Sequence, residues 1–457
     1  MLGHAVAQPL WWDGTDFPVR AALTGDRDVD VAIVGAGYTG LWTAFELARR
    51  DPSLSIIVLE RNHVGFGASG RNGGWCYDGF AAGMERIEKL SSHETARDFG
   101  VALREMVGEV AAVVDSEAID CDFHHGGSIE FLRNGGQVAR AEESVAQARR
   151  YGWSETDLRI VTAGEASEIG RAADVQAGLW SKHTATLQPA RLALGLAEAV
   201  ERRGVEVVES TTVTRIEPGR VLTAAGASVR APVIVRATEG YTADLEGEHR
   251  SLSPLYSLMI ATEPLSAERW SEIGLEGRPA FGDLRHLVIY GQRTPEGRIA
   301  FGGRGAPYDY GSRIRSDHGF PVEAFEPVRA ALIELFPSLH DVEITHRWGG
   351  VLGVSRKWMP TVGFDPATGI AWGGGDVGSG VAATNLAGRT LAELITGGSG
   401  RLTRFPWVNM RVRPWEIEPL RWLGINAALR VMSGADDVET KTDKPARRAE
   451  LLWKAIK

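Results

Sequence analysis

The chain has 457 residues, of which 50 are Lys or Arg and 59 are Asp or Glu, so its formal net charge is -9. This length favours two domains, and the acidic balance, without any basic block, argues against a nucleic-acid-binding protein. No signal peptide and no run of about 18 apolar residues is recognisable, so we expect a cytoplasmic protein without a membrane span. Cys76 and Cys121 are the only cysteines, too few for a disulfide framework and without metal-ligand spacing.

The first predicted elements come from residues 28–60, which read DVDVAIVGAGYTGLWTAFELARRDPSLSIIVLE. The run Val31–Val34 predicts a buried strand, apolar residues at helical spacing predict a helix over 41–48, and Ser55–Leu59 predicts a second buried strand. Glycines crowd the strand-to-helix turn between the first two elements. This arrangement is typical of a dinucleotide-binding unit.

The glycines and the acid after the second strand have separate tasks in such a unit. Gly35 makes the tight turn, Gly37 lets the backbone approach a pyrophosphate, and Gly40 brings helix against strand. Glu60 would accept hydrogen bonds from ribose hydroxyls, whereas Arg61 would suit NADP, and this unit alone leaves the choice open. The nucleotide contacts predicted here are Gly35, Ala36, Gly37, Tyr38, Thr39, Gly40, Glu60 and Arg61.

Further helices follow along the chain. After a glycine-rich loop at 61–75, the pair Ser91 and Glu94 forms a capping-box pattern that predicts a helix to about Ala118. Two more helices are predicted near 136–151 and over 189–204. The tail segment 415–432 predicts an amphipathic helix packed on its own domain, with binding to a membrane surface as the alternative.

The predicted strands fall into two groups. Strands are expected at 126–132 and in three successive runs across 205–240. Between 251 and 345, apolar and polar residues alternate as they do in half-buried antiparallel strands. Residues 370–395 return to a glycine-rich strand-to-helix pattern. The nucleotide domain is therefore expected to be discontinuous, with the second sheet as an insertion.

Three later segments carry a family resemblance: GASGRNGG at 67–74, ATEG at 237–240 and GGGDVGSGV at 373–381. With them the sequence, over about residues 9–425, resembles the FAD-dependent oxidoreductases of the D-amino acid oxidase family, in particular the γ-glutamylputrescine oxidase-like branch. The resemblance implies that the nucleotide is FAD. It adds as cofactor contacts Ala68, Ser69, Arg71, Asn72, Gly73, Gly74, Val213, Thr238, Gly240, Gly375, Gly378, Ser379, Gly380 and Val381.

The resemblance also describes how the flavin would be held. Free N–H groups at the helix start near Gly380 would face the flavin, where reduction develops negative charge. Ser379 stands where relatives often have His, and Glu239 where many have Asn. Because Arg71 replaces the His that anchors flavin in some relatives, and residues 350–363 contain no Cys, we expect FAD to be bound non-covalently.

The fold class predicted from these observations is α/β. It combines a discontinuous Rossmann-like FAD-binding domain of the glutathione-reductase type with an inserted substrate domain built on a mainly antiparallel sheet. The predicted ranges are 1–90, 155–250 and 346–410 for the FAD-binding domain, 91–154 and 251–345 for the substrate domain, and 411–457 for a C-terminal helical extension.

The substrate side rests on Arg304 and a set of aromatic residues. Arg304 follows an apolar strand, and it would bind a carboxylate or phosphonate of the substrate, promote oxygen reduction as the resemblance suggests, or form a plain salt bridge. Aromatic faces attract cations and exclude water, although aromatic residues in strands are often plain core. At most half of the candidates Trp75, Tyr256, Tyr290, Tyr308, Trp348 and Trp358 are expected to touch a ligand.

The predicted activity is oxidation of a C–N bond in a small amine or amino acid. Hydride would pass to flavin N5, the imine would hydrolyse, and oxygen would reoxidise the flavin and give hydrogen peroxide. The alternatives are a dehydrogenase that passes electrons to a quinone or carrier protein, and a non-catalytic flavin-binding protein. His124 and His125 are adjacent on a predicted strand and point to opposite faces, so no metal site is expected.

Overall fold

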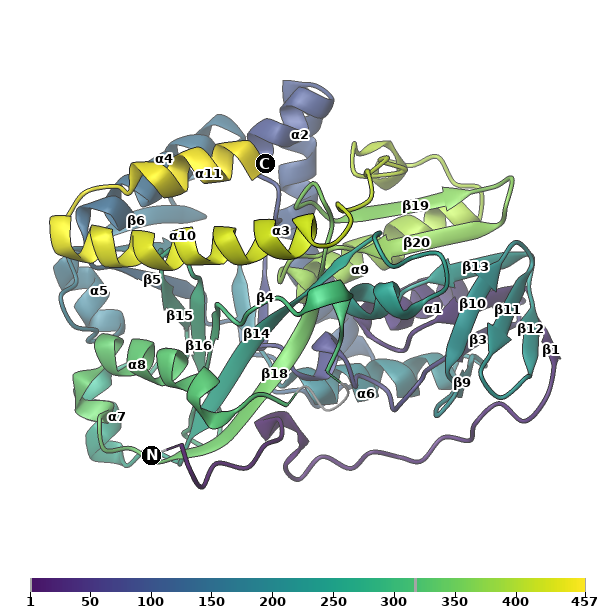
Figure 1. Cartoon of the computed structure of the whole chain (residues 1–457), viewed down its shortest axis with the longest axis horizontal. Helices are drawn as coiled ribbons and strands as arrows, with labels where there is room; N and C mark the ends of the chain where they lie inside the picture. The colour runs from purple at the N-terminus through teal and green to yellow at the C-terminus, as the bar shows by residue number, and fades with distance from the viewer. Residues whose placement is uncertain (1, 316–318, 457) are drawn as a thin grey trace.

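The computed structural model describes residues 2–315 and 319–456. One half of the molecule is built on a six-stranded sheet (Figure 1) with the order β19 (Thr361–Asp365), β20 (Ile370–Gly374), β13 (Val233–Arg236), β2 (Val31–Val34), β3 (Ile56–Leu59) and β9 (Glu206–Val208). All neighbours are parallel except β19 and β20. The predicted strand, helix and strand over 28–60 are confirmed, because α1 (Tyr38–Arg50) connects β2 to β3.

Both faces of the parallel sheet are covered, which explains why β2 is apolar throughout. Val31 and Ile33 face a core shared with helices on one side, whereas Ala32 and Val34 face a small sheet on the other. The helices that share the first core are α1, α3 (His93–Ser116), α6 (Pro189–Glu201) and α9 (Gly380–Ile395). The small sheet has the order β1 (Arg27–Asp28), β12 (Ser228–Arg230), β11 (Arg220–Thr223) and β10 (Val213–Glu217).

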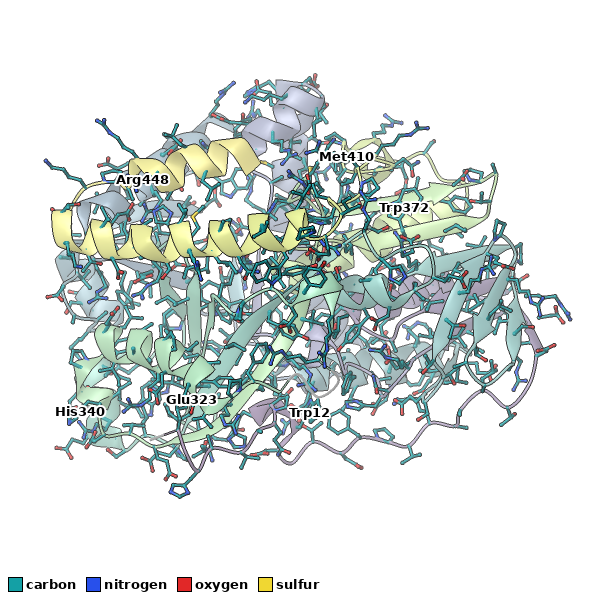
Figure 2. The ribbon with its side chains drawn as sticks, viewed as in Figure 1. Trp12, Glu323, His340, Trp372, Met410 and Arg448 are labelled. Carbon is teal, nitrogen blue, oxygen red and sulfur yellow. The ribbon has the colours of Figure 1, made fainter. Side chains whose placement is uncertain are left out.

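The other half is built on an eight-stranded sheet with the order β18 (Ile344–Val354), β14 (Ser253–Thr262), β17 (Ile299–Arg304), β16 (Ile289–Arg293), β15 (Ala280–Asp283), β5 (Ser128–Leu132), β7 (Ala177–Ser181) and β6 (Leu158–Thr162). Every neighbouring pair is antiparallel except β15 and β5. The predicted fold class is therefore confirmed. Figure 2 places Trp372 on the side of the parallel sheet, His340 at the far edge of the second half, and Trp12 between them.

The remaining elements lie around these sheets. A two-stranded sheet pairs β4 (Trp75–Tyr77) with β8 (Thr184–Thr186). The other helices are α2 (Met84–Leu90), α4 (Gly135–Arg150), α5 (Ala163–Ile169), α7 (Ala267–Ile273), α8 (Glu326–Leu335), α10 (Leu420–Thr442) and α11 (Arg447–Ile456). Among the helices of the described ranges, none is both long and apolar enough to cross a lipid bilayer.

The structure corrects several predicted positions. β6 and β7 were assigned to the FAD-binding domain, and so was most of β18, but all three pair within the eight-stranded sheet. α3 was assigned to the substrate domain, yet it packs in the core of the parallel sheet. Ser92, and not Ser91, caps α3 by accepting a hydrogen bond from the Thr95 N–H. A local pattern identifies a strand or a helix, but its neighbours are chosen by packing with distant segments. The other predicted boundaries stay a proposal.

The C-terminal helices lie over the second half of the molecule (Figure 1). The Asp436 carboxylate on α10 accepts hydrogen bonds from the backbone N–H groups of His286 and Leu287, in the loop between β15 and β16. Apolar residues of α10 and α11 pack on one another and on Leu287. The predicted tail helix is therefore present, and it is held against the eight-stranded sheet.

Candidate functional site: two adjoining cavities

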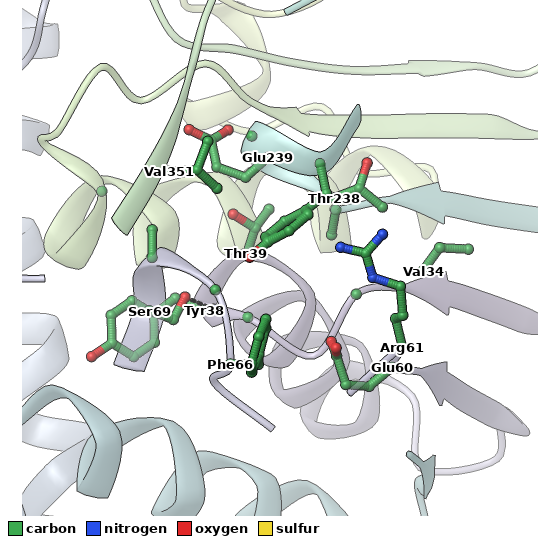
Figure 3. Close-up of a pocket in the computed structure, with 18 of the residues that line it drawn as sticks. Val34, Tyr38, Thr39, Glu60, Arg61, Phe66, Ser69, Thr238, Glu239 and Val351 are labelled. Atoms are coloured by element: carbon green, nitrogen blue, oxygen red, sulfur yellow. Dashed lines mark hydrogen bonds between the residues drawn. The ribbon is translucent and has the colours of Figure 1, made fainter. Parts of the chain in front are cut away.

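A cavity lies at the carboxyl ends of the central parallel strands (Figure 3). Val34 at the end of β2, Leu59 at the end of β3 and Ala237 just after β13 all line it. Ligands of open α/β sheets bind at this edge, so the fold itself places a binding site here. Figure 3 shows Glu60 and Arg61 at one end of the cavity and Glu239 with Val351 at the other.

The glycine turn shapes the floor of this cavity because side chains cannot be accommodated there. A Cβ atom on Gly35, whose φ is +108°, would lie 2.5 Å from the Ala237 carbonyl oxygen. A Cβ on Gly40 would lie 2.0 Å from the Gly35 carbonyl oxygen. Gly37, the N-cap residue of α1, has no side chain to cap the helix, and the Ser69 hydroxyl accepts a hydrogen bond from the Tyr38 N–H at 2.9 Å. Bare backbone and a positive helix end suit the pyrophosphate of a dinucleotide.

At one end of the cavity, Glu60 is held by backbone groups. Its carboxylate accepts hydrogen bonds from the N–H groups of Ala36 and Asn62, both at 2.9 Å. Burial raises its pKa above the ordinary range for a glutamic acid. The neighbouring Arg61 forms an ion pair with Asp244 at 2.8 Å. An acid fixed at the end of the second strand is the feature that binds ribose hydroxyls in dinucleotide folds.

At the other end, a buried pair of acids borders the cavity. Glu239 has a φ of +41°, unusual for a residue other than glycine, and its carboxylate accepts hydrogen bonds from the N–H groups of Gly353 and Gly375 at 3.1 and 2.7 Å. Burial raises the pKa of Glu239 to about 7. Burial, together with the charge of Glu239, also raises the pKa of Asp376 well above its usual value. The sequence analysis did not single out Asp376.

Fifteen of the cofactor contacts predicted from the sequence line this cavity. They are Gly35, Gly37, Tyr38, Thr39, Glu60, Arg61, Ala68, Ser69, Asn72, Val213, Thr238, Gly240, Gly378, Gly380 and Val381. The donor set, which combines a bare glycine turn, the acid after β3 and the uncapped start of α9, fits FAD.

Seven other predicted contacts do not line the cavity, and several of them pack behind its wall. Ala36 and Gly40 belong to the floor of the turn, and Gly375 donates to Glu239. The Arg71 guanidinium lies over the rings of Trp12 and Phe66, at 4.6 and 4.9 Å from their centroids. The others are Gly73, Gly74 and Ser379.

The sequence analysis also missed residues that line the cavity. They are Val34, Leu59, Asn62, Phe66, Gly67, Thr211, Ala237, Glu239, Tyr241, Asp244, Leu245, Val351, Leu352, Asp376 and Thr384. Val34 and Leu59 could have been predicted from the sequence, since they end the two predicted strands. Val351 and Leu352 could not, because they reach the site from β18 of the other sheet.

A second cavity adjoins the first. Leu352 borders both cavities. Of the aromatic residues predicted to contact substrate, Tyr256 and Trp358 line this cavity. Trp415, which the sequence analysis did not single out, lines it too and donates its indole N–H to the Val354 carbonyl oxygen at 2.7 Å.

The other aromatic candidates do not line the second cavity. The indole N–H of Trp75 donates to the Gly291 carbonyl oxygen, and that of Trp348 donates to the Arg71 carbonyl oxygen. The Tyr290 hydroxyl is hydrogen-bonded to the Ser257 hydroxyl at 2.7 Å. Trp348 and Tyr308 are buried. These rings therefore have structural partners, as aromatic residues in strands commonly do.

Arg304 lies at the junction of the two cavities. It lines the second cavity, and its guanidinium lies beside Gly378, which lines the first. Its Nη2 donates to the carbonyl oxygen of Val377, a β-branched residue held at a φ of +52°. Burial lowers the pKa of Arg304, while the hydroxyls of Tyr77 and Tyr290 act to raise it. Within the described residues it has no carboxylate partner, so they do not form the plain salt bridge that was one of the three alternatives considered from the sequence.

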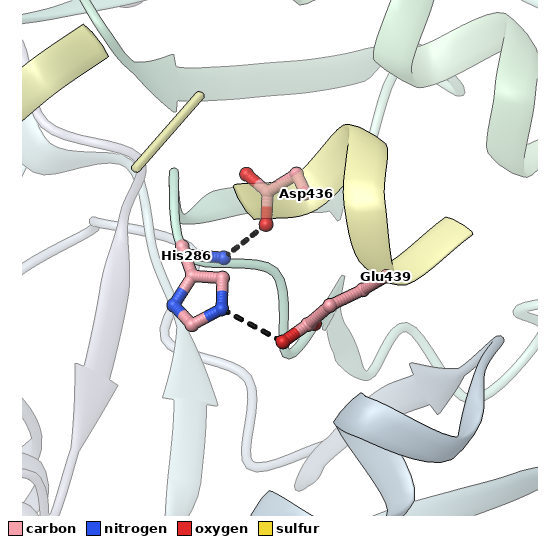
Figure 4. Close-up of side chains that lie close together, drawn as sticks. All are labelled: His286, Asp436 and Glu439. Atoms are coloured by element: carbon pink, nitrogen blue, oxygen red, sulfur yellow. Dashed lines mark hydrogen bonds and ion pairs between the residues drawn. The ribbon is translucent and has the colours of Figure 1, made fainter. Parts of the chain in front are cut away.

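A cluster of His286, Asp436 and Glu439 lies under α10 and has the composition of a metal site (Figure 4). The imidazole Nε2 of His286 lies 2.9 Å from a Glu439 oxygen. Arg140 forms a two-pronged ion pair with Glu439 at 2.6 and 2.7 Å. Burial acts to raise the pKa of Glu439, but its hydrogen bonds with His286 and Arg140 together lower that pKa to about 2. Because the Arg140 guanidinium already neutralises the Glu439 carboxylate, we interpret the cluster as a structural contact that holds α10 in place.

The pair His124 and His125 is likewise engaged with the backbone. A ring nitrogen of His124 lies 2.8 Å from the Gly277 carbonyl oxygen, and one of His125 lies 3.0 Å from the Lys182 carbonyl oxygen. The two imidazoles therefore contact different segments, as expected for neighbours with opposite orientations.

Comparisons with known proteins identify the family of this chain. Residues 30–394 match the family model described as FAD dependent oxidoreductase. The chain is 34% identical over 385 residues to gamma-glutamylputrescine oxidoreductase of Escherichia coli (strain K12), which covers 82% of this chain and 85% of that protein. It is 30% identical over 403 residues to the probable oxidoreductase OrdL of Rhizobium meliloti (strain 1021), which covers 86% and 89%.

Solved structures share the fold. The crystal structure of glycine oxidase from Geobacillus kaustophilus superposes with a TM-score of 0.70 at 19% identity, over 84% of this chain and 99% of that one. The structure of L-proline dehydrogenase from P.horikoshii gives a TM-score of 0.67 at 20% identity, over 82% and 96%. The family and fold predicted from the sequence are confirmed.

Proposed function

Because this chain belongs to the family of FAD-dependent oxidoreductases, we propose that it oxidises a carbon–nitrogen bond of a small amine or amino acid. Three relatives are named for γ-glutamylputrescine, sarcosine and glycine, which supports this substrate class. Bound FAD supplies the acceptor for the hydride that leaves the substrate carbon, and water then hydrolyses the resulting imine. Oxygen is the proposed final acceptor, with a quinone or carrier protein as the alternative.

The position of Arg304 carries this proposal. Its guanidinium, which pairs with no carboxylate of residues 2–315 and 319–456, lies between a dinucleotide cavity and a second, mostly apolar cavity. A partly buried charge that is not paired destabilises the folded protein unless a bound ligand of opposite charge compensates it. We infer that Arg304 binds an anionic group of the substrate and so orients the amine carbon toward the flavin. A planar guanidinium is suited to this task because it can bind a carboxylate through two parallel hydrogen bonds.

The cofactor contacts follow from the first cavity. The glycine turn and the start of α1 would hold the pyrophosphate, Glu60 the ribose, and the start of α9 the flavin end. No step of this binding needs a covalent bond, and Arg71 is engaged with Phe66 and Trp12. Acid precipitation of the yellow protein should therefore release intact FAD into solution. Flavin that stays with the polypeptide would contradict non-covalent binding.

An anaerobic spectrum tests the proposed reaction. The FAD-loaded protein is mixed with a panel of amines and amino acids, and bleaching of the flavin band near ~450 nm is followed. An enzyme of this class should lose the band with at least one compound of the panel, and readmitted oxygen or an added quinone then identifies the acceptor. Protein whose flavin stays oxidised with the whole panel would favour the non-catalytic alternative.

Two substitutions at Arg304 separate the possible roles of this residue. Arg304→Lys should raise the substrate concentration needed for half-maximal reduction by roughly 10-fold or more, since an ammonium cannot form the bidentate contact. Reoxidation by oxygen should remain near the wild-type rate. If Arg304 serves oxygen instead, Lys should be tolerated and Arg304→Met should slow only reoxidation. Stopped-flow measurement of the two half-reactions distinguishes these outcomes.

A further inference from the structure

The C-terminal segment supplies one wall of the second cavity. Trp415 and Glu416 line the cavity together with one face of α10, whose contributing residues are Leu420, Arg421, Gly424, Ile425, Ala428, Leu429 and Met432. These positions recur at spacings of three and four, so they form a single helical face. The family match ends at residue 394. The chain therefore closes a cavity beside its cofactor site with a segment that lies outside the range of the family model.

Among the described residues that line this cavity, Arg304 is the one cation that no carboxylate neutralises. Arg356 pairs with Glu416 at 2.9 Å, and Arg421 pairs with Glu418 at 3.1 Å. His286 lies against Glu439, as described above. Arg304 lacks such a partner within the described residues. A ligand that fills the cavity could therefore pair with the Arg304 guanidinium, which lies at the end of the cavity nearest the cofactor site.

The rest of the wall is apolar. Tyr256 and Trp358 provide aromatic surface on the side of the eight-stranded sheet, and Trp415 provides it from the segment before α10. Leu429 and Ile425 provide aliphatic surface on α10, and Ile425 packs in one cluster with Trp415. A very small polar substrate would leave most of this surface in contact with water, whereas a bulky apolar group would remove it from water.

We propose that the face of α10 from Leu420 to Met432 is the specificity wall of the active site, and that it selects a substrate with one carboxylate and a bulky apolar body, aromatic or branched. The carboxylate binds Arg304, and the apolar body occupies the space between Trp358, Trp415 and α10. This inference rests on the proposed function for the claim that the ligand is oxidised. The binding preference itself concerns only this chain's own residues.

Equilibrium binding to the FAD-loaded protein tests the preference without any turnover. 2-Naphthoate carries one carboxylate and a bulky apolar body, acetate lacks the body, and 2-naphthylmethanol lacks the charge. Calorimetry should give an affinity for 2-naphthoate about 100-fold higher than for acetate, because the ring system is buried. It should be roughly 10-fold or more above that of 2-naphthylmethanol, because the alcohol cannot pair with Arg304.

Neighbouring alanines on α10 give a matched pair of variants. Ala428 lines the cavity, whereas Ala427 is exposed and is absent from the cavity wall. Ala428→Phe should fill part of the space and weaken 2-naphthoate binding roughly 10-fold or more, while acetate binding stays within about 2-fold. Ala427→Phe should bind both ions as the wild type does. Equal effects of the two variants, or none from Ala428→Phe, would overturn the assignment of the wall.

A glycine pair repeats the test with a different geometry. A Cβ on Gly424 or on Gly434 meets no atom within 4 Å, but only Gly424 lines the cavity. Both glycines lie in α10, so Leu at either position improves helix propensity to the same degree and should not unfold the protein. Gly424→Leu should weaken 2-naphthoate binding, and Gly434→Leu should not.

The outcomes separate this inference from the proposed function. Binding of 2-naphthoate that depends on Ala428 and Arg304 supports the inference, even if every amine of the panel fails to bleach the flavin. Bleaching by small amines, with no preference for 2-naphthoate over acetate, supports the proposed function and overturns the inference. A preference that survives in Arg304→Met would also overturn it, because the anion would then bind elsewhere.

Discussion

The two cavities are built by opposite means. The first is formed largely by backbone: a glycine turn, the starts of α1 and α9, and the ends of parallel strands. The second is formed by side chains from β14, β17, β18, the segment before α10 and α10 itself. A nucleotide presents the same phosphates and ribose to every protein, so a backbone cradle suffices to bind it. A variable substrate requires side chains that can change without disturbing the fold.

This difference predicts that the two cavities tolerate substitution unequally. The largest effect is expected for Gly40→Ala, whose Cβ would lie 2.0 Å from the Gly35 carbonyl oxygen and 3.2 Å from an Ile33 methyl group. Backbone would have to move, so we expect about 3 kcal/mol or more of lost stability, together with loss of bound FAD. Thermal unfolding and the ratio of flavin to protein measure both effects.

A glycine in a surface helix is the control for that substitution. A Cβ on Gly108, within α3, would meet no atom within 4 Å. Gly108→Ala should leave FAD content unchanged and stabilise the protein by up to about 1 kcal/mol through helix propensity. If Gly40→Ala behaved like Gly108→Ala, the tight turn would not be the feature that shapes the first cavity.

A smaller effect is expected from the buried acid at the flavin end. The pKa of Glu239 is about 7 in the folded protein against an ordinary 4.5, so the folded state holds the proton more tightly than the unfolded chain does. The stability of the FAD-free protein should therefore fall as the pH rises from about 4.5 to about 7, by roughly 2–3 kcal/mol from this group. Glu239→Gln should remove that contribution.

Denaturant unfolding of FAD-free wild type and variant at a series of pH values measures this difference. Asp376→Asn should change the pH dependence with the same sign, because burial and the charge of Glu239 raise the pKa of that acid as well. A wild type and a Glu239→Gln variant that lose stability in parallel between pH 4.5 and 7 would show that Glu239 is not the titrating group.

The difference between the backbone-lined first cavity and the side-chain-lined second cavity also explains which site residues could be predicted from the sequence. The backbone cradle was predictable because Gly35, Gly37 and Gly40 are required by sterics at a fixed spacing, and Glu60 follows the next strand. Arg304 was predictable as a strand-end cation but not in its role. Trp415 and Ala428 could not be predicted as cavity residues, since they reach the site through the packing of α10 against a distant loop.

The smallest effect concerns the ribose end of the first cavity. Glu60 accepts hydrogen bonds from the Ala36 and Asn62 N–H groups, and in the complex its carboxylate would also bind ribose hydroxyls. Glu60→Gln keeps one carbonyl oxygen as an acceptor and removes the charge, so its FAD affinity should fall roughly 10-fold, about 1.4 kcal/mol. This is milder than deletion of the side chain, because Glu60→Ala would leave both backbone donors without an acceptor. Fluorescence titration of FAD-free protein at matched salt measures the affinity, and Glu246→Gln, an exposed acid outside the cavity lining, is the control. Equal FAD affinities for wild type and Glu60→Gln would mean that the backbone cradle alone binds the nucleotide.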